Sequence, residues 1–187
     1  MLPKASTILD FELIHPQLGK YDLDSIKGKW SFIFFGYTRC PDVCPTELFM
    51  MAEMMRKIEE NPSVEIRPPQ VVLISLDPQQ DTQELLQQYA GSYHPSFIGV
   101  TGKQSNVDRL AKSMGVFSER VYHLNGSVLI FDPQEGILEG LENSYLINHA
   151  TSIFLVNPNG KLHAVLSAPH QPDVMIRDFA TIQNAWR

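Results

Sequence analysis

Three short, nearly continuous apolar runs constrain the fold of this chain more than any other feature. They are Trp30–Phe35, Val71–Leu76 and Ser152–Val156. Runs of this length suit strands that are buried on both faces, and they are far too short to cross a membrane as helices. Because segments with helical character separate the runs, we expect an α/β fold with a central mixed sheet flanked by helices.

Four segments have the pattern of helices. They run from Pro45 to Glu60, from Asp81 to Tyr89, from Asn106 to Met114 and from Asp173 to Trp186. The first carries an apolar stripe that includes several methionines, which we expect to pack in the core. Asp81 is expected to act as the N-cap of the second helix, because Asp-Thr-Gln-Glu resembles a capping box.

Turn residues predict three hairpins around this framework. Leu9–Ile14 and Tyr21–Leu23 flank a Pro and Gly turn, which indicates an N-terminal β-hairpin. The Asn-Pro-Asn-Gly turn after the third apolar run leads into a partner strand, Lys161–Leu166. Residues 118–144 contain Asn-Gly at 125–126, a strong hairpin signal, and we expect an extra hairpin and loop there.

Length and charge exclude several classes of protein. The chain has 187 residues, the length of one domain, and we expect a single domain over residues 1–187. Its net charge of −6 argues against a general nucleic-acid binder, so no nucleic-acid partner is expected. Two cysteines are too few for a scaffold held by disulfides.

The most informative motif is Cys40-Pro-Asp-Val-Cys44-Pro, between the first buried strand and the first long helix. The positive end of a helix dipole favours negative charge and should therefore promote thiolate. With helix-like spacing the two Cα atoms lie about 6 Å apart, a distance that a disulfide tolerates. The pair could therefore bind a metal ion or close a disulfide, but not both at once.

Around this motif the chain resembles the SCO/SenC family of thioredoxin-like copper-binding proteins. The resemblance rests on Gly36-Tyr-Thr followed by the cysteine motif, and on Ile74-Ser-Leu-Asp-Pro-Gln-Gln-Asp-Thr82. It continues through Phe97–Gly102 and Tyr145–His149 and covers nearly the whole domain. It implies a thioredoxin-like fold.

The resemblance also implies a ligand set and a function. Carried over residue by residue, the metal ligands fall on Cys40, Cys44 and His149. Two thiolates and one imidazole suit copper, as Cu(I) or Cu(II). The family's role implies a metallochaperone that delivers copper to a receiving protein such as a cytochrome c oxidase subunit. A thiol-reducing partner would keep the cysteines reduced. The family also implies a location outside the cytosol, the bacterial periplasm, with a membrane anchor in the full-length protein.

Two other functions remain open at this point. A thiol–disulfide oxidoreductase would use Cys40 and Cys44 as its catalytic pair. Against it, three residues separate the cysteines instead of two, and no proline stands between Asn148 and Ser152, where thioredoxins carry their cis-proline. A peroxiredoxin would explain the fold and a reactive cysteine, but not the set of two cysteines and one histidine.

We also assign expected roles to the other polar residues near these motifs. The family has Asp-His-Ser where this chain has Asn148-His149-Ala150, and we expect Asn148 to orient the imidazole by a hydrogen bond. Asp77 is expected at the same sheet edge as the cysteines, where it would steer the site or a partner, or shape a turn. His123 is expected to be an ordinary residue before the extra hairpin, with a role as an accessory ligand as the alternative. The remaining histidines are expected on the surface; they are His15, His94, His163 and His170.

Overall fold

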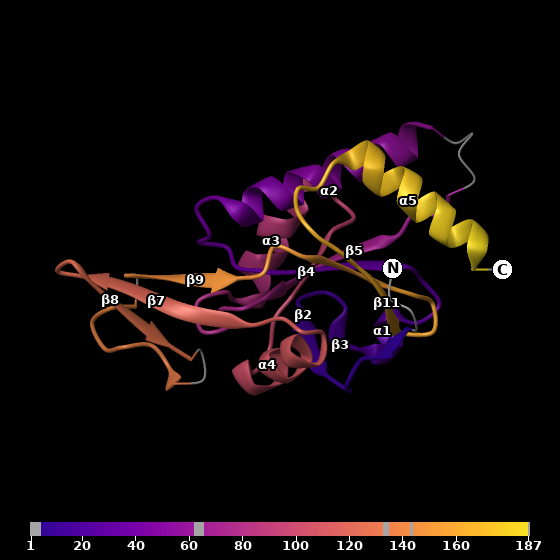
Figure 1. The fold of residues 1–187 in the computed structure, drawn as a ribbon. Coiled ribbons are helices and arrows are strands. Elements are labelled where there is room, and N and C mark those ends of the chain that lie inside the picture. The colour runs from indigo at the N-terminus through magenta and orange to yellow at the C-terminus, as the bar shows by residue number, and fades with distance from the viewer. Residues whose placement is uncertain (1–4, 62–65, 133–134, 143, 187) are drawn as a thin grey trace.

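A six-stranded mixed sheet forms the centre of the computed structural model, which describes residues 5–61, 66–132, 135–142 and 144–186 (Figure 1). Its strand order is β1-β11-β10-β4-β5-β6. Strands β4, β5 and β6 are parallel, whereas β10 is antiparallel to both β4 and β11. The strands are β1 (Ser6–Thr7), β4 (Ser31–Gly36), β5 (Gln70–Ser75), β6 (Ile98–Val100), β10 (Ile153–Val156) and β11 (Lys161–Leu166).

The three apolar runs form the centre of this sheet, as predicted. In chain order they become β4, β5 and β10, and every residue of β4 and β10 is buried. The antiparallel pair of β10 and β11 confirms the predicted C-terminal hairpin. The short strand β6 was not predicted, because three residues carry too little periodicity to be recognised.

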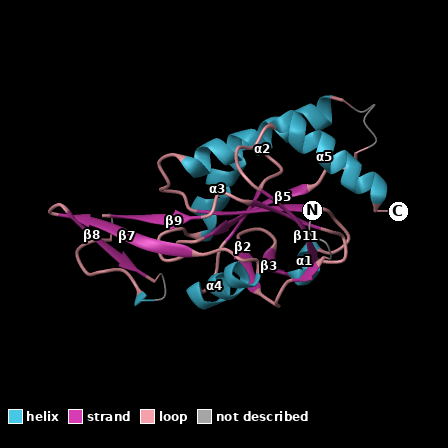
Figure 2. Ribbon diagram, in the orientation of Figure 1, coloured by secondary structure: helices cyan, strands magenta, loops and turns pink. Residues whose placement is uncertain are grey.

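Helices cover both faces of the sheet (Figure 2). The long helix α2 packs against α5 on one face, while α4 and the short α1 lie on the other side. The helices are α1 (Leu23–Ile26), α2 (Val43–Glu60), α3 (Gln83–Tyr93), α4 (Gln104–Ser113) and α5 (Pro172–Ala185). The methionines at 51, 54 and 55 of α2 are buried, which confirms that they pack in the core. No helix in the described part of the chain is long and apolar enough to span a membrane.

Two smaller sheets accompany the central one. Strands β2 (Glu12–His15) and β3 (Gly19–Asp22) form the predicted N-terminal hairpin. The expected partner strand extended one residue too far, because Asp22 caps α1 and Leu23 already belongs to that helix.

The second small sheet projects from one end of the molecule (Figure 1). It contains β7 (Ser118–Leu124), β8 (Ser127–Phe131) and β9 (Tyr145–His149), in the order β8-β7-β9. The hairpin of β7 and β8 is confirmed, and Asn125 and Gly126 both have positive φ at its turn. Strand β9 was not predicted. It extends the hairpin into a sheet and brings Ser118 opposite His149.

Three of the four histidines expected on the surface are buried, and the fourth, His163, is partly buried. His15, His94 and His170 are only 5%, 4% and 8% exposed. Each is buried with polar partners; for example, His15 Nε2 lies 2.8 Å from Gln87 Oε1. A histidine near a turn can be buried at little cost when its ring nitrogens find such partners.

His170 links α2 to the segment after β11. Its contacts there lead us to expect that the stability of the fold depends on pH. Its Nδ1 lies 2.6 Å from a carboxylate oxygen of Glu47, and its Nε2 lies 3.1 Å from the Leu166 carbonyl. Burial alone would lower the pKa of His170, but the bonds to Glu47 and Leu166 outweigh it and raise the pKa above the ordinary 6.5. Both nitrogens then donate, as they do in imidazolium.

Because the folded pKa is raised, the ion pair stabilises the fold fully below pH 6.5. That contribution is lost as pH rises through the folded pKa. His170→Gln should therefore lower the free energy of unfolding by about 1–3 kcal/mol at pH 6, because Glu47 loses a buried charged partner. The deficit should shrink at pH 8.5. Urea denaturation of reduced, metal-free protein measures the loss in free energy of unfolding at both pH values. His123→Gln, on the exposed hairpin, serves as the control. An equal deficit at both pH values would contradict the assignment.

Candidate metal centre

The two cysteines lie where β4 passes into α2. After Gly36 the chain turns through residues 37–42, with the Cys40 N–H donating to the Tyr37 carbonyl at 3.3 Å. Cys40 is partly buried in this loop, whereas Cys44 is fully buried. The helix begins at Val43, two residues before the expected start at Pro45, and its N-cap is Asp42. Cys44 therefore lies inside the first turn.

The thiols differ in their chemistry because they lie in different surroundings. The Cys44 N–H donates to Cys40 Sγ at 3.5 Å. The hydrogen bond from the Cys44 thiol, together with N–H groups of Cys44 and Asp42, lowers the pKa of Cys40 to about 4, even though burial opposes this shift. The same thiol contact and burial raise the pKa of Cys44. Cys40 is therefore the thiolate of the pair, and Cys44 is a protonated thiol that must lose its proton to bind a metal ion.

His149 completes the group from a distant part of the sequence. It ends β9, and its Nε2 lies 3.5 Å from Cys44 Sγ, a contact between residues 105 positions apart. Its Nδ1 lies 2.9 Å from the Ala150 carbonyl oxygen. Since a carbonyl can only accept, Nδ1 carries the proton in the neutral ring and the Nε2 lone pair faces the thiols. That is the tautomer a metal ligand requires.

The three donor atoms form a compact set. Cys40 Sγ, Cys44 Sγ and one ring nitrogen of His149 all lie within 4.8 Å of one another. Thiolate and imidazole ligands lie about 2.0–2.3 Å from a metal ion, so a small closure would let all three contact one ion. Two sulfur donors and one nitrogen donor, without a carboxylate, suit a soft ion such as Cu(I) and leave one side open.

Gly36 makes room for the buried thiol. A Cβ at this position would lie 2.9 Å from Cys44 Sγ and 3.1 Å from the ring of Phe34. Real side chains do not tolerate such contacts, so glycine is required where β4 passes beneath the cysteine. Sequence reasoning missed this role, although a glycine at the end of a buried strand is a signal of close approach.

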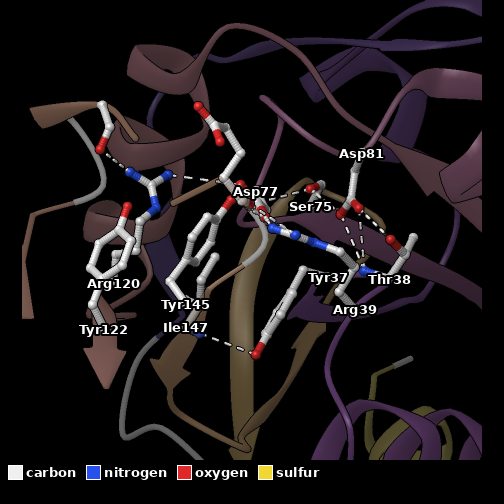
Figure 3. A network of polar contacts seen from close by, with 12 residues as sticks. Tyr37, Thr38, Arg39, Ser75, Asp77, Asp81, Arg120, Tyr122, Tyr145 and Ile147 are labelled. Atoms are coloured by element: carbon white, nitrogen blue, oxygen red, sulfur yellow. Dashed lines mark hydrogen bonds and ion pairs between the residues drawn. The ribbon is translucent and has the colours of Figure 1, made fainter. Parts of the chain in front are cut away.

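Aromatic side chains hold the imidazole in place. The rings of Phe34 and Tyr37 lie edge-on to His149, with centroids 6.0 and 6.1 Å away. The Tyr37 hydroxyl accepts a hydrogen bond from the Ile147 N–H at 3.1 Å, which ties β9 to the cysteine loop (Figure 3). Asn148 is exposed, and alternation along the strand directs it to the opposite face from His149. The Nδ1 partner is thus the Ala150 carbonyl and not the expected Asn148 side chain.

Two buried carboxylates, Asp77 and Asp81, contact Arg39 and Thr38 of the cysteine loop (Figure 3). Asp81 accepts hydrogen bonds from the hydroxyls of Ser75, at 2.6 Å, and Thr38, at 2.5 Å. The expected N-cap role was wrong, because Thr82 caps α3 and Asp81 instead fastens the loop to β5. Asp77 is fully buried as well, so it cannot contact a partner directly, and of its expected roles those within the site and its turn remain.

His123 is not brought to the centre. It pairs with Val128, whereas Ser118 at the other end of β7 lies opposite His149. Five residues of strand separate the two positions by about 17 Å. The geometry therefore excludes the alternative of an accessory ligand and agrees with the expected ordinary role of His123. The loop of the extra hairpin segment reaches the residue before Cys40, because the Arg39 guanidinium donates to the Glu142 carbonyl at 3.0 Å.

Comparison with known protein families identifies relatives along the whole fold. The SCO1/SenC family profile matches residues 1–184. An SCO2-like protein of Rickettsia felis is 34% identical over 152 residues, which are 81% of this chain and 65% of the relative. The mitochondrial protein SCO1 homolog 1 of Arabidopsis thaliana is 32% identical over 148 residues, or 79% of this chain. The chain spans only 38% of that relative's length.

Solved structures confirm the thioredoxin-like fold. The crystal structure of Arabidopsis thaliana ScoI with copper bound matches with a TM-score of 0.79 at 25% identity. The match covers 97% of this chain and 100% of that one. The expected α/β architecture is therefore confirmed over nearly the entire sequence.

Proposed function

The chain belongs to the SCO1/SenC family, and on that premise we propose that it binds one copper ion through Cys40, Cys44 and His149 and delivers it to another copper protein. One observation carries the proposal: two thiols and one imidazole, from segments far apart in the sequence, converge within 4.8 Å. A relative of this fold is known with copper bound.

The donor set suits a carrier that must release its ion. A closed structural zinc site would use four protein ligands, whereas three leave a face open for a ligand of the receiving protein. Two thiolates can hold Cu(I) alone, and the imidazole adds a donor that Cu(II) prefers. We propose a cytochrome c oxidase subunit as the receiving protein, in keeping with the family's role.

A second function would use the same thiols without copper. Cys40 is a partly exposed thiolate, and Cys44 beside it is a buried thiol, the arrangement of an attacking and a resolving cysteine. A thiol–disulfide oxidoreductase is therefore the alternative. Either function needs a thiol-reducing partner whenever the pair closes into a disulfide.

The same family membership supports a site of action outside the cytosol. Thiol chemistry that includes a disulfide state belongs outside the reducing cytosol. We propose an extracytosolic location, the bacterial periplasm, with the full-length protein anchored to the membrane.

Redox state should control copper uptake, because a disulfide offers no thiolate. Reduced protein is expected to bind one equivalent of Cu(I) under anaerobic conditions. Oxidised protein should bind little and recover after reduction. Bound copper is measured after gel filtration, with the disulfide verified by mass spectrometry. Equal uptake by both forms would refute the thiolate site, and rapid thiol exchange by reduced protein that takes up no copper would favour the oxidoreductase.

A further inference from the structure

Asp77 lies at the carboxyl end of β5 and is not one of the three metal donors. It contacts residues from both segments that carry those donors. Its two carboxylate oxygens lie 2.8 and 2.7 Å from the Tyr145 hydroxyl. The Arg39 guanidinium lies 3.1 Å from Oδ2, and that of Arg120 lies 3.7 Å from Oδ1 (Figure 3). Asp77 and Arg120 are fully buried.

The partners of Asp77 come from different sides of the centre. Arg39 immediately precedes Cys40 in the thiol loop. Tyr145 begins β9, the strand that ends at His149. One carboxylate thus contacts both the segment that carries the thiols and the segment that carries the imidazole.

The ring of Tyr145 strengthens this junction. The guanidinium carbons of Arg39 and Arg120 each lie 4.8 Å from the ring centroid, within the range of a cation–π contact. Burial and the neighbouring Asp77 carboxylate raise the pKa of Tyr145 far above its ordinary 10. The hydroxyl therefore stays protonated and donates to Asp77.

We propose that Asp77 is a positioning residue of the metal centre, which sets the distance between the thiol loop and His149 by holding Arg39 and Tyr145 together. The inference rests on the proposed copper site and deepens it. Without the carboxylate, Arg39 loses its buried anion and the Tyr145 hydroxyl loses its acceptor. Strand β9 can then shift against the loop, and the imidazole no longer stands at a fixed distance from Cys44.

Two conservative substitutions test this role. Tyr145→Phe keeps the ring between the guanidiniums and removes one hydroxyl, and Asp77→Asn keeps the volume and removes the charge. Outer-shell partners of metal ligands typically affect affinity by about 10–100-fold. We therefore expect a 10–100-fold weaker Cu(II) affinity and a shifted Cu(II)–thiolate absorption band in both variants. Cu(I) binding should change much less, because two thiolates can hold this ion.

A change of stability alone would not produce this pattern. Phe179→Leu, in the packing of α5 on Phe32, serves as a control that should lower the melting temperature without removing a contact of Asp77 or a metal donor. Its Cu(II) spectrum should match that of the wild type. Should Asp77→Asn not fold, Tyr145→Phe decides the question.

The outcomes separate the two proposals. The Cu(II) spectrum of the wild type should depend on His149. If it does, but Tyr145→Phe and Asp77→Asn both show the unchanged wild-type spectrum, the positioning role alone is overturned. The positioning role would also be overturned if the absorption band of Phe179→Leu shifted as much as the bands of Tyr145→Phe and Asp77→Asn. Wild-type protein that binds no copper would overturn the copper site, and the positioning role with it.

Discussion

Replacing Cys40 by serine is expected to abolish tight Cu(I) binding. Cu(I) is a soft ion that prefers thiolate, and the serine hydroxyl is a hard and poor ligand for it. In zinc-finger sites four ligands together contribute about 10–16 kcal/mol, or roughly 3 kcal/mol each. Loss of one thiolate of similar strength should weaken binding by at least about 100-fold. Anaerobic competition against a Cu(I) chelator of known affinity measures the change.

Cys40 is the better of the two positions for this experiment. It is only partly buried, so serine should leave the fold intact, whereas a hydroxyl in place of the fully buried Cys44 also disturbs packing. Cys44→Ser should nevertheless show the same loss of Cu(I). Circular dichroism verifies the fold of each variant. Unchanged stoichiometry and affinity in Cys40→Ser would remove the basis for the proposed centre.

The second large effect concerns His149. His149→Ala should abolish or strongly alter the Cu(II)–thiolate absorption, because imidazole suits Cu(II) and two thiolates alone hold it poorly. Cu(I) binding should persist in weakened form. The loss of one ligand of average strength corresponds to about 100-fold in Cu(II) affinity. Absorption and electron paramagnetic resonance spectra of the Cu(II)-loaded variant measure the effect.

His123→Ala provides a matched control for this substitution. It removes a histidine from the far end of β7, about 17 Å along the strand from the position opposite His149. Its Cu(II) spectrum should be that of the wild type. The ligand assignment fails if His149→Ala leaves the spectrum unchanged, or if His123→Ala removes it.

Local features of the centre could be predicted from the sequence. The strand, the cysteine motif and the following helix are contiguous, so short-range rules placed both thiols where β4 passes into α2. His149 could not be reached in this way. It lies 105 positions after Cys44, no local pattern marked β9 as a strand, and only the family resemblance identified it.

Features that depend on tertiary packing were missed or misread. Gly36 is required because Cys44 Sγ lies above it; a glycine at the end of a buried strand signals a close approach, but the local sequence does not reveal which residue makes it. Asp81 has the sequence context of an N-cap, yet it lies behind the loop because Ser75 and Thr38 offer it hydroxyls. Buried polar residues follow their partners in space, and those partners cannot be read from one segment.

The most direct test of the copper centre is X-ray absorption at the copper edge on protein loaded with one equivalent of Cu(I). Two sulfur scatterers and one imidazole nitrogen are expected in the first coordination shell. Cys40→Ser should retain one sulfur, and His149→Ala should lose the imidazole signal while it keeps both sulfurs. A shell without sulfur in the wild type, or one that neither substitution alters, would contradict a centre built from Cys40, Cys44 and His149.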